Sequence, residues 1–177
     1  MDRDASLAGR KTAGRATVNF RPLPAAVPGA SFGTVPNNEA GMADTIRKID
    51  YYYVTAPDKP GVGAQILGKL RDAGVNLFAV HAFPSARRSQ LDVVPADAVA
   101  FQAAAKAAGL KFSKPKTVFL VDGDDRIGAF AQLLSRLGAA GINVTAATGV
   151  RSGMGRYGAL VWVKPGDVRK AAEVLGA

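Results

Sequence analysis

Hydrophobic and polar positions alternate in a regular way from Ile49 onward and predict strands and helices in a fixed order. The stretch "IDYYYVTA" is rich in aromatic and β-branched residues and predicts a strand that ends at Pro57. A helix is expected from about residue 61 to residue 73, because apolar residues recur there at helical spacing on one face. Gly74 is expected to end this helix, since glycine is favoured just after a helix C-terminus.

The next part of the chain predicts a hairpin, a second helix and a short strand. Strands are expected over "VNLFAVHAF" and "SQLDVV", with "SARR" as the turn between them. Pro95 is expected to open an alanine-rich helix that ends at Gly109, and "LKFSK" predicts a fourth strand. The predicted order is therefore β-α-β-β-α-β.

The same pattern occurs a second time. "DKPGVGAQILGKLRDAGVNL", which begins at Asp58, is followed 67 residues later by "DRIGAFAQLLSRLGAAGINV", and nine of the twenty aligned positions are identical. "KTVFLVDG", "INVTAATGV" and "YGALVWV" predict the strands of this copy, and the last helix is expected from Pro165. "PAD" at Pro95 and "PGD" at Pro165 are 70 residues apart, so a three-residue insertion is expected in the second hairpin. The sequence ends before a fourth strand, which predicts that the second copy lacks its last strand.

The first part of the chain has a different composition. Residues 1–41 hold four of the ten prolines and little apolar periodicity, which is typical of a segment that cannot bury enough surface to fold. We expect a disordered or loosely ordered tail over residues 1–44. Either "ATVNF" in this tail, as a short strand, or a second subunit could complete the second copy. The expected modules are then residues 45–114 and 115–177.

Composition narrows the class of protein. The absence of cysteine excludes disulfides, thiolate catalysis and cysteine-ligated zinc. No apolar run reaches the roughly 18 residues that span a bilayer, and no secretory signal is recognisable, so we expect a cytoplasmic protein without membrane contact. The net charge of +9 comes from scattered basic residues, which indicates a solvated surface and leaves a nucleic-acid or anionic-ligand face open.

Three motifs that could carry chemistry do not fit their sequence context. "GMGRYG", from Gly153, lies between two predicted strands and is interpreted as a hairpin turn rather than a dinucleotide fingerprint. "VDGDD" lacks the later ligands of a calcium loop. His81 is the only histidine and has no partner for a metal site or a triad, although it is a candidate ligand contact. We therefore predict no enzyme activity, no metal and no cofactor.

The element that recurs is the turn between the first strand and the first helix of each copy. It reads D-(K/R)-x-G, and an asparagine follows fifteen residues after the glycine, at a strand start that we expect to lie beside the turn. The first amides of a helix have no internal partner and lie at the positive end of its dipole, and glycine lets a ligand approach the backbone. This turn is therefore a candidate site for a carboxylate, unless glycine and asparagine only shape the turns.

The repeated turn, the apolar helix and the "GVN" or "GIN" that follows resemble the ACT domain, a small-molecule regulatory module of amino-acid metabolism. The resemblance covers about residues 46–177 and implies an α+β fold of two ferredoxin-like βαββαβ modules in tandem, with antiparallel sheets and helices on one face. It implies a non-catalytic sensor or regulatory subunit that binds an amino acid, acts by ligand-dependent association or conformational change, controls a separate enzyme and forms a homodimer. The predicted ligand-binding residues are Asp58, Lys59, Pro60, Gly61, Val62 and Asn76 in the first copy, and Asp125, Arg126, Ile127, Gly128, Ala129 and Asn143 in the second.

Ile127 replaces the proline that is usual in such a turn, so the first copy is expected to hold the better site. Two other classes remain open. The RNA-recognition motif shares this strand order, but it stacks bases on aromatic side chains of its first and third strands, and "SQLDVV" contains none. RNA binding is therefore the less favoured alternative, and a purely structural assembly partner is the third.

Overall fold

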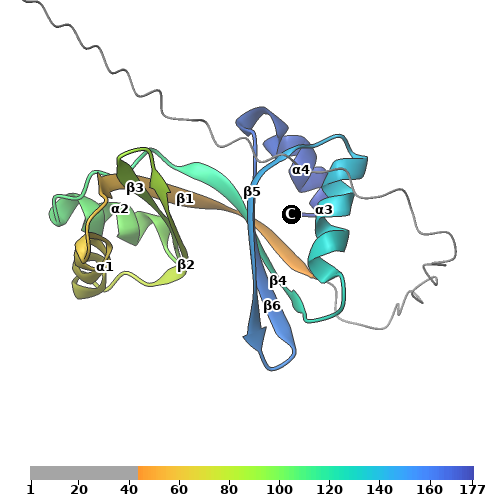
Figure 1. The fold of residues 1–177 in the computed structure, drawn as a ribbon, viewed down its shortest axis with the longest axis horizontal. Helices are drawn as coiled ribbons and strands as arrows, with labels where there is room; N and C mark the ends of the chain where they lie inside the picture. The colour runs from red at the N-terminus through yellow and green to blue at the C-terminus, as the bar shows by residue number, and fades with distance from the viewer. Residues whose placement is uncertain (1–43) are drawn as a thin grey trace, which may run out of the picture. The chain divides into compact units, whose positions relative to one another are not determined.

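The computed structural model describes residues 44–177, and the predicted tail before Asp44, "ATVNF" included, lies outside them. The described part contains six strands, one short 3-10 helix and four α-helices (Figure 1). In chain order these are β1 (Thr45–Pro57), α1 (Val62–Asp72), β2 (Leu77–Ser85), β3 (Arg88–Pro95), α2 (Ala98–Ala107), β4 (Lys116–Asp124), α3 (Ala129–Ala139), β5 (Val144–Gly153), β6 (Arg156–Val163), η1 (Pro165–Asp167) and α4 (Val168–Leu175).

The six strands form one antiparallel sheet in the order β2-β3-β1-β4-β6-β5. The predicted α+β class is confirmed. β1 and β4 lie at the centre, where Asp50 pairs with Thr117. These two residues are 67 positions apart, which is the offset of the sequence repeat. The two copies of the strand-helix-strand-strand-helix order therefore meet along their first strands with approximate twofold symmetry.

The prediction of a strand over "LKFSK" is wrong. Residues 110–115 contain no strand, although Ser113 N donates to Tyr53 O (2.8 Å) and Tyr53 N donates to Ser113 Oγ (3.1 Å). The segment lies beside β1 only at Tyr53, and β4, which begins at Lys116, continues the pairing along β1 from Tyr51 to Thr45. The same pairing places β1 on the edge of β4 opposite β6. The first strands of the two copies thus lie side by side at the centre of the sheet.

The insertion in the second copy is also placed differently from the prediction. Phe119 is the counterpart of Tyr52 in the repeat. Val161 pairs with Phe119 and Val93 pairs with Tyr52, so residues of β6 are 68 positions after their counterparts in β3, one more than the 67 of the repeat. One extra residue accounts for this and coincides with a register shift between Arg151 and Gly153. The other two extra residues lie after β6, before α4. The predicted glycine-rich hairpin turn is confirmed, because residues 153–155 all have positive φ between β5 and β6.

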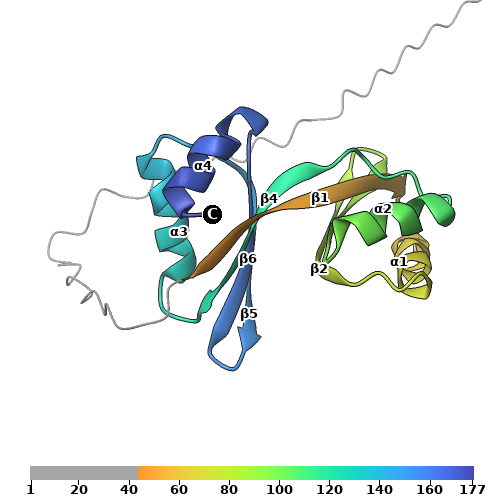
Figure 2. The same ribbon diagram turned by 180° about the vertical axis from the view of Figure 1, so that it is seen from behind.

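The helices all cover one face of the sheet. Along β1, Ile46 packs against α3 and α4, and Tyr52 and Ala56 pack against α1 and α2. These residues are separated by even numbers of positions, so they project from the same side of the strand. Figures 1 and 2 show α1 and α2 beside β1 to β3, and α3 and α4 beside β4 to β6. The predicted arrangement with helices on one face is confirmed for the described residues.

The other face of the sheet curls in on itself. Val94, Val118, Leu160 and Trp162 form a third buried cluster there, with Tyr51 packed against it. The curl brings the two edge strands together, because His81 of β2 lies 3.4 Å (Nδ1 to Oγ1) from Thr148 of β5. This inner face therefore holds a small buried cluster between the two halves.

Candidate ligand-binding site

The first predicted turn connects β1 to α1 at the surface. Asp58, Lys59 and Pro60 are exposed, and Asp58 Oδ1 accepts a hydrogen bond from Ser89 Oγ at 2.8 Å. Gly61 takes a φ of 84°, a conformation that costs glycine little because it has no Cβ. The chain can therefore turn sharply from the strand into the helix that begins at Val62.

Helix α1 begins with amides that have no partner within the helix. The first helical bond runs from Gln65 N to Gly61 O at 3.0 Å, and Val62 N donates to Lys59 O at 3.4 Å. The amides of Gly63 and Ala64 are left at the exposed helix end, as the geometry of an α-helix requires. The backbone conditions for the predicted carboxylate site are therefore present at this turn.

The second predicted turn repeats this geometry with more contacts. Gly128 has a φ of 78°, and Gln132 N donates to Gly128 O at 2.9 Å. Asp125 N donates to Gly155 O (2.7 Å), and the Asp125 carboxylate pairs with Arg151 at 2.5 Å. Ile127, which replaces the usual proline, is fully exposed. The ion pair joins the turn to β5.

A pocket of about 300 Å³ lies beside this second turn. The turn and the start of α3 form one wall, and β5 with Tyr157 forms the other. Gly149 of β5 faces the ring of Phe130, and a Cβ at that position would be in ordinary van der Waals contact with the ring at 3.5 Å. Its lining residues are Asp125, Arg126, Gly128, Ala129, Phe130, Ala131, Gly149, Val150, Arg151 and Tyr157. Four of the residues predicted for the second site thus lie together in one cavity.

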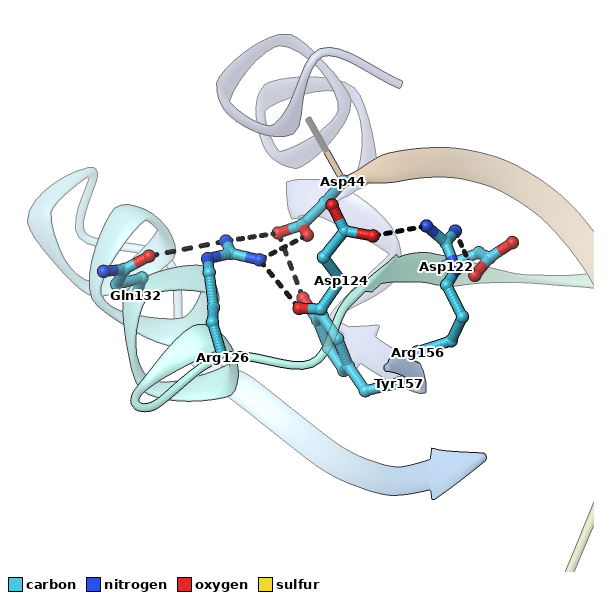
Figure 3. Close-up of polar contacts among 7 residues, drawn as sticks. All are labelled: Asp44, Asp122, Asp124, Arg126, Gln132, Arg156 and Tyr157. Carbon is cyan, nitrogen blue, oxygen red and sulfur yellow. Dashed lines mark hydrogen bonds and ion pairs between the residues drawn. The ribbon is translucent and has the colours of Figure 1, made fainter. Parts of the chain in front are cut away.

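Arg126 is held in a polar network rather than directed freely into this pocket (Figure 3). Its guanidinium donates to both carboxylate oxygens of Asp44 at 2.8 and 3.0 Å, and to the carbonyl of Asp124 at 3.2 Å. Tyr157 Oη donates to Asp44 Oδ2 at 3.0 Å. A Cβ on Gly123 would overlap the Asp44 carboxylate, so glycine is needed there. The charge of Arg126 is therefore already balanced by Asp44.

The network shifts two pKa values in opposite directions. The hydrogen bond from Arg126 holds the pKa of Asp44 below its ordinary value. Burial, followed by the hydrogen bond to Asp44, raises the pKa of Tyr157 to about 12. Asp44 is thus a stable anion and Tyr157 a stable neutral donor. Asp44 was not among the predicted site residues, because it precedes the first periodic segment and its partners are 82 and 113 residues away.

The two predicted asparagines do not lie at the turns. Asn76 accepts at its backbone carbonyl from Ala96 N, beyond the end of β3, whereas Asp58 contacts Ser89 at the start of that strand. The eleven residues of α1 also place about 16 Å between the helix ends. Asn143 follows α3 in the same way. The expectation that each asparagine lies beside its turn is wrong, because the helix carries the chain away from it.

His81 lies on the inner face of the sheet, away from both turns. Its ring is 5.5 Å from the ring of Trp162 and 5.3 Å from that of Phe83, and it pairs in register with the buried Asp92. It therefore belongs to the contact between the edge strands β2 and β5. Among residues 44–177, no group of three or more acidic or histidine side chains could hold a metal ion. No helix in that range is long and apolar enough to cross a membrane.

Several solved structures have a backbone similar to that of this chain and show its fold. The protein BT0572 from Bacteroides thetaiotaomicron is 18% identical, with a TM-score of 0.63 over 74% of this chain and 88% of that chain. The ligand-free regulatory subunit of aspartate kinase from Thermus thermophilus is 13% identical, with a TM-score of 0.55 over 77% and 97%. The aspartokinase alpha and beta subunits are 19% identical, with a TM-score of 0.51 over 77% and 96%.

The fold is ACT-like. This supports the arrangement of strands and helices that the sequence resemblance implied. Because the sequence identities are only 19% and 13%, the similarity shows the fold alone. No protein-family model matches the chain, and no curated protein matches it. The candidate site within this ACT-like fold therefore depends on the geometry of the two turns and of the pocket.

Proposed function

We propose that this chain is a non-catalytic regulatory protein of two tandem ACT modules, residues 45–114 and 115–177, that binds an amino acid. Binding would change its conformation or its association with a partner. The observation that carries the proposal is the pocket between the first turn of α3 and strand β5, because it combines helix amides with a fixed carboxylate. The fold shared with a protein titled as an aspartate kinase regulatory subunit supports it.

The pocket provides complementary groups for the two charges of an amino acid. The amides of Phe130 and Ala131 begin α3 without a partner inside the helix and suit a carboxylate. The carboxylate of Asp125 suits the ammonium group and pairs with Arg151, whose side chain is 74% exposed. Charge-assisted bonds of this kind contribute about 1.5–3 kcal/mol each.

We place the principal site at the second turn, although the sequence favoured the first. The residues of both turns are exposed, but the second turn also lines a pocket together with β5. The exposed Ile127 shows that the proline is not needed to form this turn. The first turn has the same free amides and remains a predicted second site.

A thermal-shift screen with the twenty amino acids at millimolar concentration tests the proposal. We expect one or a few of them to raise the melting temperature. Asp125→Asn should then weaken that ligand by about tenfold or more, because it removes the charge partner of the ammonium group. Asp58→Asn, the matching change at the first turn, is the control and should leave the affinity unchanged. If Asp58→Asn weakens binding and Asp125→Asn does not, the site is at the first turn instead.

RNA binding is the alternative, and the geometry gives it little support. An RNA-recognition sheet presents aromatic side chains on an open face. Here Tyr51 faces inward and packs edge-on against the buried Trp162, with ring centroids 6.0 Å apart. Twenty negative results in the amino-acid screen, together with tight salt-sensitive binding to RNA, would reverse this ranking.

A further inference from the structure

A second and larger pocket lies where β4 begins and β6 ends, away from both turns. Its volume is about 550 Å³, within the range of small-molecule sites. It extends from β1 across the sheet to the start of α4. The residues that matter most for its chemistry are Tyr51, Lys116, Thr145, Trp162, Lys164 and Pro165.

The charged residues of this pocket are cationic. Lys116 and Lys164 line it, and no carboxylate does. Within residues 44–177 neither lysine forms an ion pair, and Lys116 Nζ lies 4.6 Å from the centre of the Tyr53 ring. The carboxylate of Asp92 also acts on Lys116, but it is buried and outside the lining, and burial raises its pKa. A positive field without a matching anion therefore remains.

Trp162 adds a polar group that lacks a partner. Its Nε1 is the only buried side-chain nitrogen or oxygen in the described part of the chain without a hydrogen bond. Most buried polar groups in folded proteins are satisfied, so such an atom calls for an explanation. Trp162 forms part of the pocket wall. The residue with the unsatisfied indole nitrogen is thus part of the wall that a ligand would contact.

The first half of the chain does not have these features. At the offset of the repeat, Lys116 corresponds to Ile49, and the strand register places Trp162 where the first half has Val94. The two extra residues of the second half also lie in this segment. Val161 is 68 positions after its counterpart Val93, whereas Asp167, which precedes α4, is 70 positions after Asp97, which precedes α2. The segment that contains Lys164 and Pro165 is thus an addition. The repeated fold alone does not explain this pocket.

We propose that this pocket is a second ligand site, specific for a small organic acid with two carboxylates. Lys116 and Lys164 would bind the carboxylates, and the apolar surfaces of Tyr51, Pro165 and Val168 would contact the carbon chain. The volume and these apolar walls favour an organic acid over an inorganic ion. The site shares no lining residue with the proposed amino-acid pocket, so the two proposals can be tested independently.

The protein carries its own reporter, because Trp162 is the only tryptophan in the sequence. Succinate, glutarate, acetate and inorganic phosphate are titrated at constant ionic strength while the fluorescence of Trp162 is recorded. We expect a saturable change with the two dicarboxylates. Lys116→Met and Lys164→Met should each weaken it by about tenfold or more, since each removes a charge-assisted bond. Lys116→Arg should restore much of the affinity.

Two controls separate this site from other effects. Lys106→Met changes a lysine on α2 outside the pocket and should bind as the unchanged protein does. Asp125→Asn should also leave the titration unchanged. The proposal is overturned if no dicarboxylate gives a saturable change, if both lysine variants bind normally, or if inorganic phosphate binds as tightly as the dicarboxylates. Circular dichroism of each variant confirms that a lost response is not lost folding.

Discussion

Asp44 connects the start of β1 to the second half of the chain. Its side chain is only 10% exposed, and it accepts from Arg126 and Tyr157 beside the backbone of Gly123. Because Arg126 and Tyr157 both line the pocket beside the second turn, this one carboxylate holds residues of two of its walls without lining it. We therefore expect Asp44 to affect stability first and ligand binding indirectly.

Replacing Asp44 by asparagine tests this role. Asp44→Asn keeps the size of the side chain but leaves Arg126 without its anion, so we expect a loss of about 1–3 kcal/mol in unfolding free energy. Urea unfolding at neutral pH measures it. Asp72→Asn is the control, because Asp72 pairs with Arg71 where both side chains are mostly exposed, 67% and 80%. That change should cost less than about 1 kcal/mol. Equal losses in the two variants would contradict the proposed role of Asp44.

The contribution of Asp44 should depend on pH in a defined direction. Its pKa is lower in the folded protein than the ordinary value near 4, so its stabilisation is present above pH 4. That stabilisation is lost as the pH falls through the lower folded-state pKa. We therefore expect the stability difference between the unchanged protein and Asp44→Asn to shrink below about pH 4. A difference that stays constant from pH 7 to pH 3 would show that the charge of Asp44 contributes little.

Tyr157 should be among the last tyrosines to ionise. Its pKa of about 12 lies above the ordinary value of 10.0, so the neutral phenol is favoured by folding. The associated stability is complete below pH 10 and is lost as the pH rises from 10 toward 12. Absorbance at the phenolate band should show a component near pH 12 that disappears in Tyr157→Phe. Persistence of that component would assign it to another of the four tyrosines.

At the scale of the elements, the repeat provides a matched test of helix capping. Asp97 accepts from the amides of Val99 and Ala100 at the start of α2, at 2.8 and 2.9 Å. Asp167 precedes α4 in the same way but makes no side-chain cap. Asp97→Ala should therefore lower stability by about 1 kcal/mol, and Asp167→Ala by much less. Chemical unfolding of the two variants compares them directly. A larger loss for Asp167 would contradict this assignment.

The elements themselves were largely predictable from the sequence. The spacing of apolar residues located α1 and α3, and glycines marked their ends, because these signals are local. The start of α2 was misplaced, since Asp97 caps the helix and β3 continues to Pro95. β1 begins at Thr45 rather than Ile49, because pairing with β4 extends it over residues whose sequence has little strand character. Pairing partners were the part that local patterns could not supply.

For the candidate site too, the features set by local sequence were predictable and those set by distant contacts were not. The two glycine turns were predicted from local spacing, and the structure places them at the helix starts as expected. The pocket wall from β5 and the network around Asp44 depend on contacts between distant segments. The asparagines were assigned to the turns because a linear motif contains no information on the length of the helix between its ends. Local chemistry was thus predictable, and the assembly of the walls was not.

At the scale of the whole molecule, the shared sheet should couple the two halves. β1 pairs with β3 through Tyr52–Pro57 and with β4 through Thr45–Tyr51, so one strand belongs to both halves. The inner cluster also takes Val94 from the first half and Trp162 from the second. Unfolding of either half would expose this cluster and remove strand partners from the other. We therefore expect one cooperative transition rather than two.

Leu70 and Leu137 provide the test, since they occupy corresponding positions in the repeat and are 1% and 0% exposed. Leu70→Ala should cost about 2–5 kcal/mol through the cavity that it leaves in the first half. If the halves are coupled, the fluorescence of Trp162, which lies in the second half, should shift to lower urea concentration by as much as the circular dichroism does. Leu137→Ala should shift both signals in the same way. If Leu70→Ala does not shift the unfolding transition of Trp162 fluorescence, the halves unfold independently. The pairing of β1 with β4 would then contribute little to stability.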